Sequence, residues 1–255
     1  MSRPPLSAVI ITKDAASQLG PCLASLDFAD EILVVDSGSI DGTRELAAAK
    51  GARVIEHAWL GFGPQKRFAV SQVRNDWVLC VDADERVSPE LRESIVRELA
   101  SPRANVYEFP RRNRFMGRYL RHGEGYPDWS RRLFHREHAM WSDDAVHEQV
   151  LTSERIERLD GDLLHDSAES LDRYMEKQDS YTTLQAERMI AAGERPSVVR
   201  MLASPLVRFV KFYVFRLGFL DGVPGLVHIA IGCRNSFTKY AKARALLAAG
   251  KPAGR

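Results

Sequence analysis

The sequence predicts an α/β protein built on a mostly parallel β-sheet with helices on both faces. Four short apolar runs alternate with helix-like segments through the first hundred residues, and turn residues separate them. Alternation of this kind is typical of βα units, because a parallel strand has to be reached by a crossover connection. At 255 residues, the chain is long enough to bury a full core without disulfides.

The expected elements follow from apolar runs and from the turn and cap residues between them. We expect the first four strands at Leu6–Thr12, Glu31–Asp36, Arg53–His57 and Trp77–Val81. We expect the helices between and after them at Ser17–Leu26, Thr43–Lys50, Pro64–Val73 and Pro89–Leu99. Beyond residue 100, shorter strands near 105–110 and 128–135 precede a long helix at Leu171–Ala192.

Acidic residues stand where two of the strands end. Asp36 closes the second strand, and Asp82 and Asp84 follow the fourth in the stretch WVLCVDADERVS. Ligands of open parallel sheets bind beyond the carboxyl ends of the strands, so both acidic groups should face one crevice. Two carboxylates at i and i+2 suit a cation that a diphosphate also binds, because magnesium uses one or two protein carboxylates plus phosphates. The alternative is a solvated turn that caps the following helix.

Other nucleotide-binding signatures are absent from the sequence. No G-x-G-x-x-G follows the first strand, and there is no P-loop. The polar loop SGSIDGT after Asp36 suits a base and a ribose instead. The three cysteines have no short pairing interval, so they predict no disulfide framework and no zinc knuckle, and they fit a reducing compartment.

Four stretches form a recognisable set. They are AVIITKD (Ala8–Asp14), ILVVDSGSIDGT (Ile32–Thr43), DWVLCVDADERVSPEL (Asp76–Leu91) and VHE (Val146–Glu148). Together they resemble the inverting family 2 glycosyltransferases, which have the GT-A fold, and the likeness spans roughly Leu6 to Tyr181. The subgroup that the chain most resembles is the lipopolysaccharide-core β-glucosyltransferases of Gram-negative bacteria. That subgroup often has Asn-Glu-Glu after the first strand, where this chain has Asp-Ala-Ala at 14–16.

The resemblance implies which residues hold the donor, a UDP-sugar. Asp36 would bind uracil and ribose, helped by Thr12, Asp14 and Asp41. Lys66 would lie near the nucleotide or its phosphates.

The resemblance also implies a divalent cation, Mg²⁺ or Mn²⁺. Asp84 would coordinate it, and Asp82 would hold ribose or a metal-bound water. His165 is a further candidate ligand, with a structural histidine as the alternative. Arg132, with Arg131 and Trp129, would contact the diphosphate or the acceptor sugar, because the guanidinium fork suits phosphate.

An inverting transfer needs a base that is separate from the metal-binding pair. The base takes the proton of the acceptor hydroxyl as this group attacks the anomeric carbon. Glu148 stands where the wider family carries its base, and Asp128 in GYPDW is the alternative. His147 is expected to orient Glu148.

The C-terminal segment is both basic and apolar. From Arg200 to Arg255 there are ten Lys and Arg residues and one acid, Asp221. Basic residues interrupt its two apolar runs, so neither reaches the roughly 18 uncharged residues of a spanning helix. Basic amphipathic helices bind membrane interfaces, and we expect residues 198–244 to meet an anionic membrane surface. The apolar share is too high for a nucleic-acid-binding arm, and the alternative is a helix that packs on the core.

These observations predict a glycosyltransferase domain at 1–195 and a basic amphipathic tail at 196–255. The expected activity is metal-dependent, inverting transfer of a hexose, expected to be glucose, from a UDP-sugar to a lipid-anchored glycan such as lipopolysaccharide core. No apolar signal-peptide region precedes the first strand, so we expect a cytoplasmic protein bound peripherally to the inner face of the cytoplasmic membrane. The alternatives are transfer to a polyprenyl phosphate carrier and a non-catalytic membrane-surface adaptor with the same fold.

Overall fold

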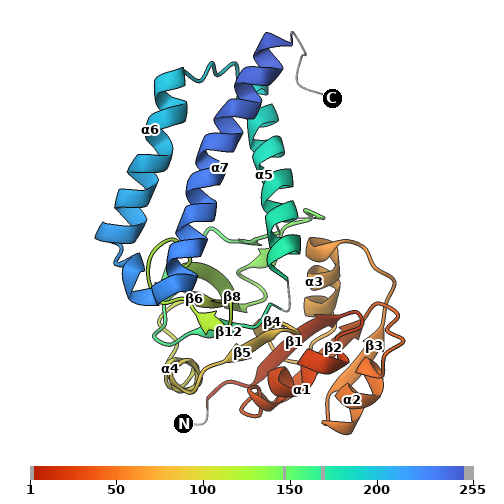
Figure 1. Ribbon diagram of the computed structural model, residues 1–255. Helices are drawn as coiled ribbons and strands as arrows, with labels where there is room; N and C mark the ends of the chain where they lie inside the picture. The colour runs from red at the N-terminus through yellow and green to blue at the C-terminus, as the bar shows by residue number, and fades with distance from the viewer. Residues whose placement is uncertain (1–2, 146–147, 168–169, 250–255) are drawn as a thin grey trace. The chain divides into compact units, whose positions relative to one another are not determined.

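The computed structural model describes residues 3–145, 148–167 and 170–249 (Figure 1). By packing, the chain divides into two compact units: 1–112 with 128–166, and 113–127 with 167–255. This division falls elsewhere than the predicted boundary after residue 195. The long helix α5 (Leu171–Ala191) belongs to the second unit, because it packs along the C-terminal helix α7 (Gly222–Ala248).

The first unit is built on a sheet that begins with four parallel strands. β1 (Leu6–Thr12) lies between β2 (Glu31–Asp36) and β4 (Trp77–Asp82), and β3 (Arg53–Glu56) flanks β2. The helices that connect these strands are α1 (Ala16–Ala24), α2 (Thr43–Ala49) and α3 (Phe62–Ser71). The predicted alternation of strands and helices is therefore confirmed.

Helices cover both faces of this sheet. Leu6 and Ile10 of β1 pack in the core cluster with residues of α1, α2 and α4 (Pro89–Leu99), whereas Val9 packs in the cluster with residues of α3. Successive side chains of a strand point to opposite faces, so a strand covered on both faces has to be continuously apolar. This explains why the strands appear in the sequence as unbroken apolar runs.

Antiparallel strands extend the sheet and make it mixed. β8 (Asp128–His135) pairs antiparallel with β4, and β6 (Val106–Phe115) pairs antiparallel with β8. The strand order along the sheet is β3-β2-β1-β4-β8-β6-β12-β5. The short strands of this sheet are β5 (Glu85–Val87), β7 (Arg118–Tyr119), β11 (Ile156–Arg158) and β12 (Leu163–His165), whereas β9 (Met140–Trp141) and β10 (Val150–Leu151) pair with each other in a separate two-stranded sheet. β12 pairs with β5, which brings a late segment of the chain beside the acidic turn after β4.

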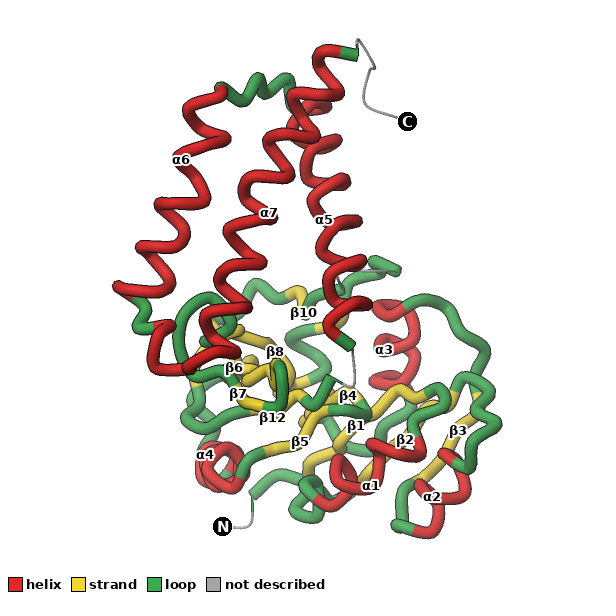
Figure 2. The backbone as a smooth tube through the Cα atoms, viewed as in Figure 1, coloured by secondary structure: helices red, strands yellow, loops and turns green. Residues whose placement is uncertain are grey.

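The second unit is mainly helical (Figure 2). α7 packs along both α5 and α6 (Val198–Phe209), and a π-helical turn at Val210–Phe215 and a 3-10 turn at Gly218–Asp221 join α6 to α7. Within this unit Arg208 pairs with Glu124 and donates to Ser236 Oγ at 2.9 Å.

α6 leaves its apolar side chains at the surface. None of its residues is buried, and the side chains of Val199 and Leu206 are 75% and 67% exposed. Taken singly, none of the described helices has the length and apolar character to cross a membrane. The segments Val198–Phe215 and Gly218–Ala248, bent by 74° relative to each other, meet that criterion only as a pair, by length and composition.

Candidate active site

The carboxyl ends of the parallel strands bring the predicted acids to one edge of the sheet. The parallel register sets Thr12 beside Asp36 and Ile11 beside Asp82. A turn at residues 83–84 separates β4 from β5. Both acidic groups therefore lie at the edge where open parallel sheets bind their ligands.

Asp36 organises the loop that follows β2. Its fully buried carboxylate accepts hydrogen bonds from Thr12 Oγ1 at 2.9 Å, from the hydroxyl and N–H groups of Ser39, and from the N–H group of Gly38. Burial works against ionisation, but these donors outweigh it and lower the pKa of Asp36. The carboxylate of Asp36 therefore fixes the shape of the loop, and its binding of uracil and ribose stays a prediction.

Asp14 and Asp41 connect the loops after β1 and β2. Asp14 Oδ1 accepts a hydrogen bond from Ile40 N–H at 2.9 Å, and Asp41 Oδ2 accepts one from Ala16 N–H at 3.0 Å. Asp14 has a φ of 49°, a left-handed conformation in which aspartate is enriched. Both residues are exposed at the sheet edge, so they hold the loops together and remain accessible there.

Four of the predicted residues form one ion-pair cluster. Lys66 Nζ lies 3.0 Å from Asp82 Oδ1 and 2.8 Å from Glu148 Oε1, and Arg132 Nη2 lies 2.9 Å from Asp82 Oδ2. Lys66 and Arg132 are both buried, and their charges lie 4.5 Å and 5.4 Å from the centre of the Trp141 ring. Glu148 and Asp82, far apart in sequence, thus share one cation.

Opposite charges stabilise the ionised forms of Asp82 and Arg132 in this cluster. Burial disfavours ionised Asp82, but Arg132 and Lys66 outweigh burial and hold the pKa of Asp82 far below its usual range. Burial also disfavours charged Arg132, and the carboxylates of Asp82 and Glu85 outweigh it and raise the pKa of Arg132. Arg132 Nη1 is buried and has no hydrogen-bond partner among the described residues. This nitrogen therefore has unused hydrogen-bonding capacity next to Asp82, although buried polar groups are normally hydrogen-bonded.

Asp84 and His165 form a second group at the same edge. His165 Nε2 lies 3.2 Å from Asp84 Oδ2, and both side chains are partly accessible. Neighbouring ligands of an octahedral ion with bonds of about 2.1 Å lie about 3 Å apart, so this pair has the chemistry and spacing to hold a divalent cation. Asp82 is placed differently, because both of its oxygens are paired with cations of the protein.

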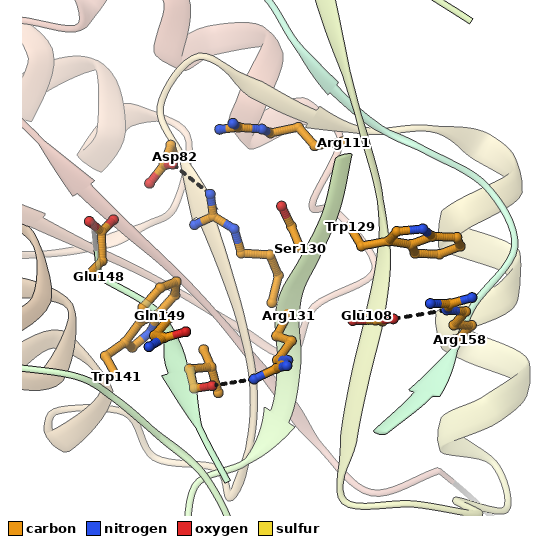
Figure 3. Close-up of a pocket in the computed structure, with 12 residues that line it drawn as sticks. Asp82, Glu108, Arg111, Trp129, Ser130, Arg131, Trp141, Glu148, Gln149 and Arg158 are labelled. Carbon is orange, nitrogen blue, oxygen red and sulfur yellow. Dashed lines mark hydrogen bonds and ion pairs between the residues drawn. The ribbon is translucent and has the colours of Figure 1, made fainter. Parts of the chain in front are cut away.

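The two candidate bases have different surroundings. Glu148 lines a cavity of about 680 Å³, with Asp82 and Trp141 on the same side (Figure 3). Asp128 is not among the residues that line this cavity, and its carboxylate Oδ2 lies 2.9 Å from Arg111 Nη2. His147, expected to orient Glu148, lies outside the described residues.

Comparison with known families decides the class of protein. The family model described as glycosyl transferase family 2 matches residues 7–153, which is more than half of the chain. The chain belongs to this family. The matched region contains the whole ion-pair cluster and Asp84, whereas His165 lies beyond it.

Relatives and solved structures agree with this assignment. The lipopolysaccharide core biosynthesis glycosyltransferase LpsC of Rhizobium meliloti is 31% identical over 93% of this chain and 91% of its own length. An uncharacterized glycosyltransferase of Rickettsia bellii is 31% identical over 98% of this chain and 90% of its own. The crystal structure of S. aureus TarS 1–349 in complex with UDP-GlcNAc has a TM-score of 0.50 at 15% identity, covering 97% of this chain and 92% of that one, and it supports the fold. The predicted GT-A fold and family are therefore confirmed.

The glycosyltransferase domain has a second pocket. The sequence predicted Thr12 as one of its residues but not Trp59 or Phe62. Its volume is about 440 Å³, and its lining includes Thr12 and Lys13 of the β1 end together with Trp59 and Phe62. These two rings meet edge to face with centroids 4.9 Å apart, and each remains nearly half exposed. The available signal was the pair of aromatics in the stretch HAWLGFG, one in the loop after β3 and one at the start of α3, since large exposed apolar side chains outside a core often mark binding.

Proposed function

We propose that this family 2 glycosyltransferase moves a hexose, with glucose as the expected one, from a UDP-sugar to a lipid-anchored glycan of the lipopolysaccharide-core type. Transfer would invert the anomeric carbon and use a divalent cation. The observation that carries the proposal is Glu148, which lines the large cavity and is held by Lys66 beside Asp82. A carboxylate separate from the cation-binding pair is what an inverting transfer requires.

The smaller pocket supports binding of the donor's base and ribose. Exposed aromatic faces such as Trp59 and Phe62 suit a nucleobase, because base–aromatic stacking is favourable for every base. Thr12 lines the same pocket. The diphosphate would then lie toward Lys66 and the unpaired Nη1 of Arg132, where two buried cations can bind its charge.

Asp84 and His165 would hold the divalent cation. Its chemistry would be to neutralise the charge that develops on the leaving diphosphate. Lys66 and Arg132, both buried, would add positive charge on the protein side.

In the transfer itself, Glu148 takes the proton of the acceptor hydroxyl. The hydroxyl oxygen bonds to the anomeric carbon from the face opposite the diphosphate. The bond between that carbon and the diphosphate oxygen breaks, and its electron pair leaves with UDP. We expect Lys66 to turn from Glu148 toward the diphosphate when the donor binds, because an ammonium group with three donors can exchange one anion for another.

The acceptor part of the proposal draws on the relative and on the second unit. LpsC is named for lipopolysaccharide core biosynthesis, and this chain aligns with nearly all of it. The exposed apolar side chains of α6, together with nearby basic residues such as Arg200 and Lys211, suit an anionic membrane surface. We therefore propose that the enzyme acts at the inner face of the cytoplasmic membrane.

The first test is calorimetric titration with UDP, GDP and CMP, each with and without Mg²⁺ or Mn²⁺. We expect UDP to bind in a metal-dependent way and the metal dependence to be lost in Asp84→Ala. Absence of metal-dependent nucleotide binding would overturn the proposal and favour a membrane-surface adaptor.

The second test identifies the acceptor. The protein is incubated with radiolabelled UDP-glucose and membranes, and the labelled lipid fraction is analysed. Label in the lipopolysaccharide fraction supports the proposal. Label on polyprenyl phosphate instead would redirect it to a carrier lipid.

A further inference from the structure

The large cavity has a second side, away from Glu148, that the transfer chemistry does not use. Figure 3 places Trp129, Glu108 and Arg158 on this side, across the cavity from Glu148 and Trp141. These residues come from β8, β6 and β11, so they stand on strands of the sheet rather than on a loop. Sites on such elements are held more rigidly than sites on loops.

Trp129 forms a fixed aromatic platform on this side. The guanidinium of Arg158 lies 4.1 Å from the centre of its ring, and Arg158 Nε donates to Glu108 Oε1 at 2.9 Å. The register of β11 and β6 sets Arg158 directly beside Glu108. The indole is nevertheless 39% exposed, so it offers apolar surface to a ligand in the cavity. A flat, positioned aromatic surface of this kind suits the C–H face of a sugar ring.

Arg131 supplies a positive charge with no acidic partner. It lies two residues from Trp129 on β8, and its Nη1 donates to the carbonyl oxygen of Val150 at 3.2 Å. In the part of the chain that the structure describes, no carboxylate pairs with Arg131, whereas the other three arginines that line the cavity, Arg111, Arg132 and Arg158, each pair with at least one. The planar guanidinium fork binds carboxylate or phosphate through two parallel hydrogen bonds.

We propose that this side of the cavity is the acceptor subsite and that it selects a sugar carrying an anionic substituent. The sugar ring would stack on Trp129, its carboxylate or phosphate would pair with Arg131, and its hydroxyl would point toward Glu148. The inference rests on the proposed function, since it assigns the substrate class for the same cavity. Arg131 acts here as a specificity-determining residue, because it binds the substituent and not the reacting atoms.

The test uses three small probes with the full chain, in the presence of UDP and Mg²⁺. The probes are methyl glucoside, methyl glucuronide and glucose 6-phosphate, and their dissociation constants are measured by ligand-observed NMR. We expect at least one anionic probe to bind about tenfold to a hundredfold more tightly than the neutral one, as a charge-assisted pair provides. The two anionic probes distinguish a carboxylate from a phosphate as the recognised group.

Variants separate the two contacts. Arg131→Gln should remove the preference for the anionic probe and leave methyl glucoside unchanged, whereas Trp129→Ala should weaken all three probes. Arg155→Gln is the matched control, because Arg155 is 84% exposed and is not among the residues that line the cavity. It should keep the wild-type preference.

Two results would overturn the inference. One is equal affinity for the three probes, or no binding of any of them, while UDP still binds with Mg²⁺. The other is an anionic preference that survives in Arg131→Gln. Failure of UDP binding in the same sample would instead overturn the proposed function, so the two failures are distinguishable.

Discussion

α4 and α6 are amphipathic helices of similar length whose apolar faces are treated in opposite ways. Each begins at a serine that caps it, Ser88 or Ser197. α4 buries Leu91 completely, along with its neighbours on that face, whereas α6 buries none of its residues and leaves Leu206 67% exposed. This difference shows that an amphipathic pattern predicts which face of a helix is apolar but not what that face packs against. In the first unit the sheet covers it, and we propose that in the second unit a membrane does.

The largest expected effect is on turnover, and it tests whether a residue of the first unit can be changed to stop the reaction without affecting membrane binding. Glu148→Gln should lower turnover by about 10²–10⁴-fold, because the amide cannot take the acceptor proton. UDP binding in the presence of Mg²⁺ should stay within a few-fold, and so should binding to anionic vesicles. Turnover is measured by release of UDP. Asp128→Asn is the matched variant, and a larger loss in that variant than in Glu148→Gln would transfer the role of base to Asp128.

The next effect concerns the stability of the first unit. Leu91→Ala should lower the free energy of unfolding by about 2–5 kcal/mol, because it removes fully buried carbons and leaves a cavity. Urea unfolding followed by tryptophan fluorescence measures this, since all four tryptophans lie in the first unit. Val96→Ala on the same helix is the control, because Val96 is 37% exposed. Equal effects of the two changes would contradict the packing described for α4.

A third prediction concerns acid sensitivity of the second unit. Burial, and secondarily Arg208, lowers the pKa of His228 in α7 to about 4. The usual pKa of histidine in an unfolded chain is about 6.5. The contribution of His228 to the free energy of unfolding is therefore fully present above pH 6.5, where the side chain is neutral in both states. That stability falls as the pH drops toward 4, by about 2 kcal/mol between pH 7.5 and pH 5.

Two spectroscopic signals locate this loss. When the pH is lowered to 5, the urea midpoint followed by far-UV circular dichroism should fall more than the midpoint followed by tryptophan fluorescence. The reason is that the second unit contains the long helices and no tryptophan. His228→Gln, which cannot titrate, should flatten the pH dependence. An unchanged slope in that variant would show that other groups cause it.

The smallest effect tests the exposed face of α6. Leu206→Ala should change the free energy of unfolding by less than about 0.5 kcal/mol, because the side chain is already largely exposed. It should weaken binding to vesicles that contain anionic lipid by roughly tenfold, since fewer carbons enter the interface. Ile40→Ala, at a residue of the first unit that is 94% exposed, should leave vesicle binding unchanged. Destabilisation by Leu206→Ala without loss of vesicle binding would mean that α6 packs within the protein.

The sequence by itself determined the parallel half of the fold. Strands β1, β2 and β4 and the cap at Ser88 lie where the sequence predicts them, because a strand buried on both faces has to be continuously apolar and a capping serine acts within one turn of its helix. The family follows from the same short-range signals, since its motifs lie at the ends of these strands. Asp36 shows the limit of this reasoning. The motif identified Asp36 as a site residue, but it did not predict that the carboxylate is buried and accepts hydrogen bonds from Thr12 and Ser39.

Only the tertiary structure decided which distant residues meet. The ion pair of Lys66 with Glu148, the approach of His165 to Asp84, and the stacking of Arg158 on Trp129 all depend on strand pairing. The same is true of the packing of α5 along α7. Local patterns fix which side of an element is apolar, but the pairing register and the packing of distant elements depend on contacts that no single segment encodes.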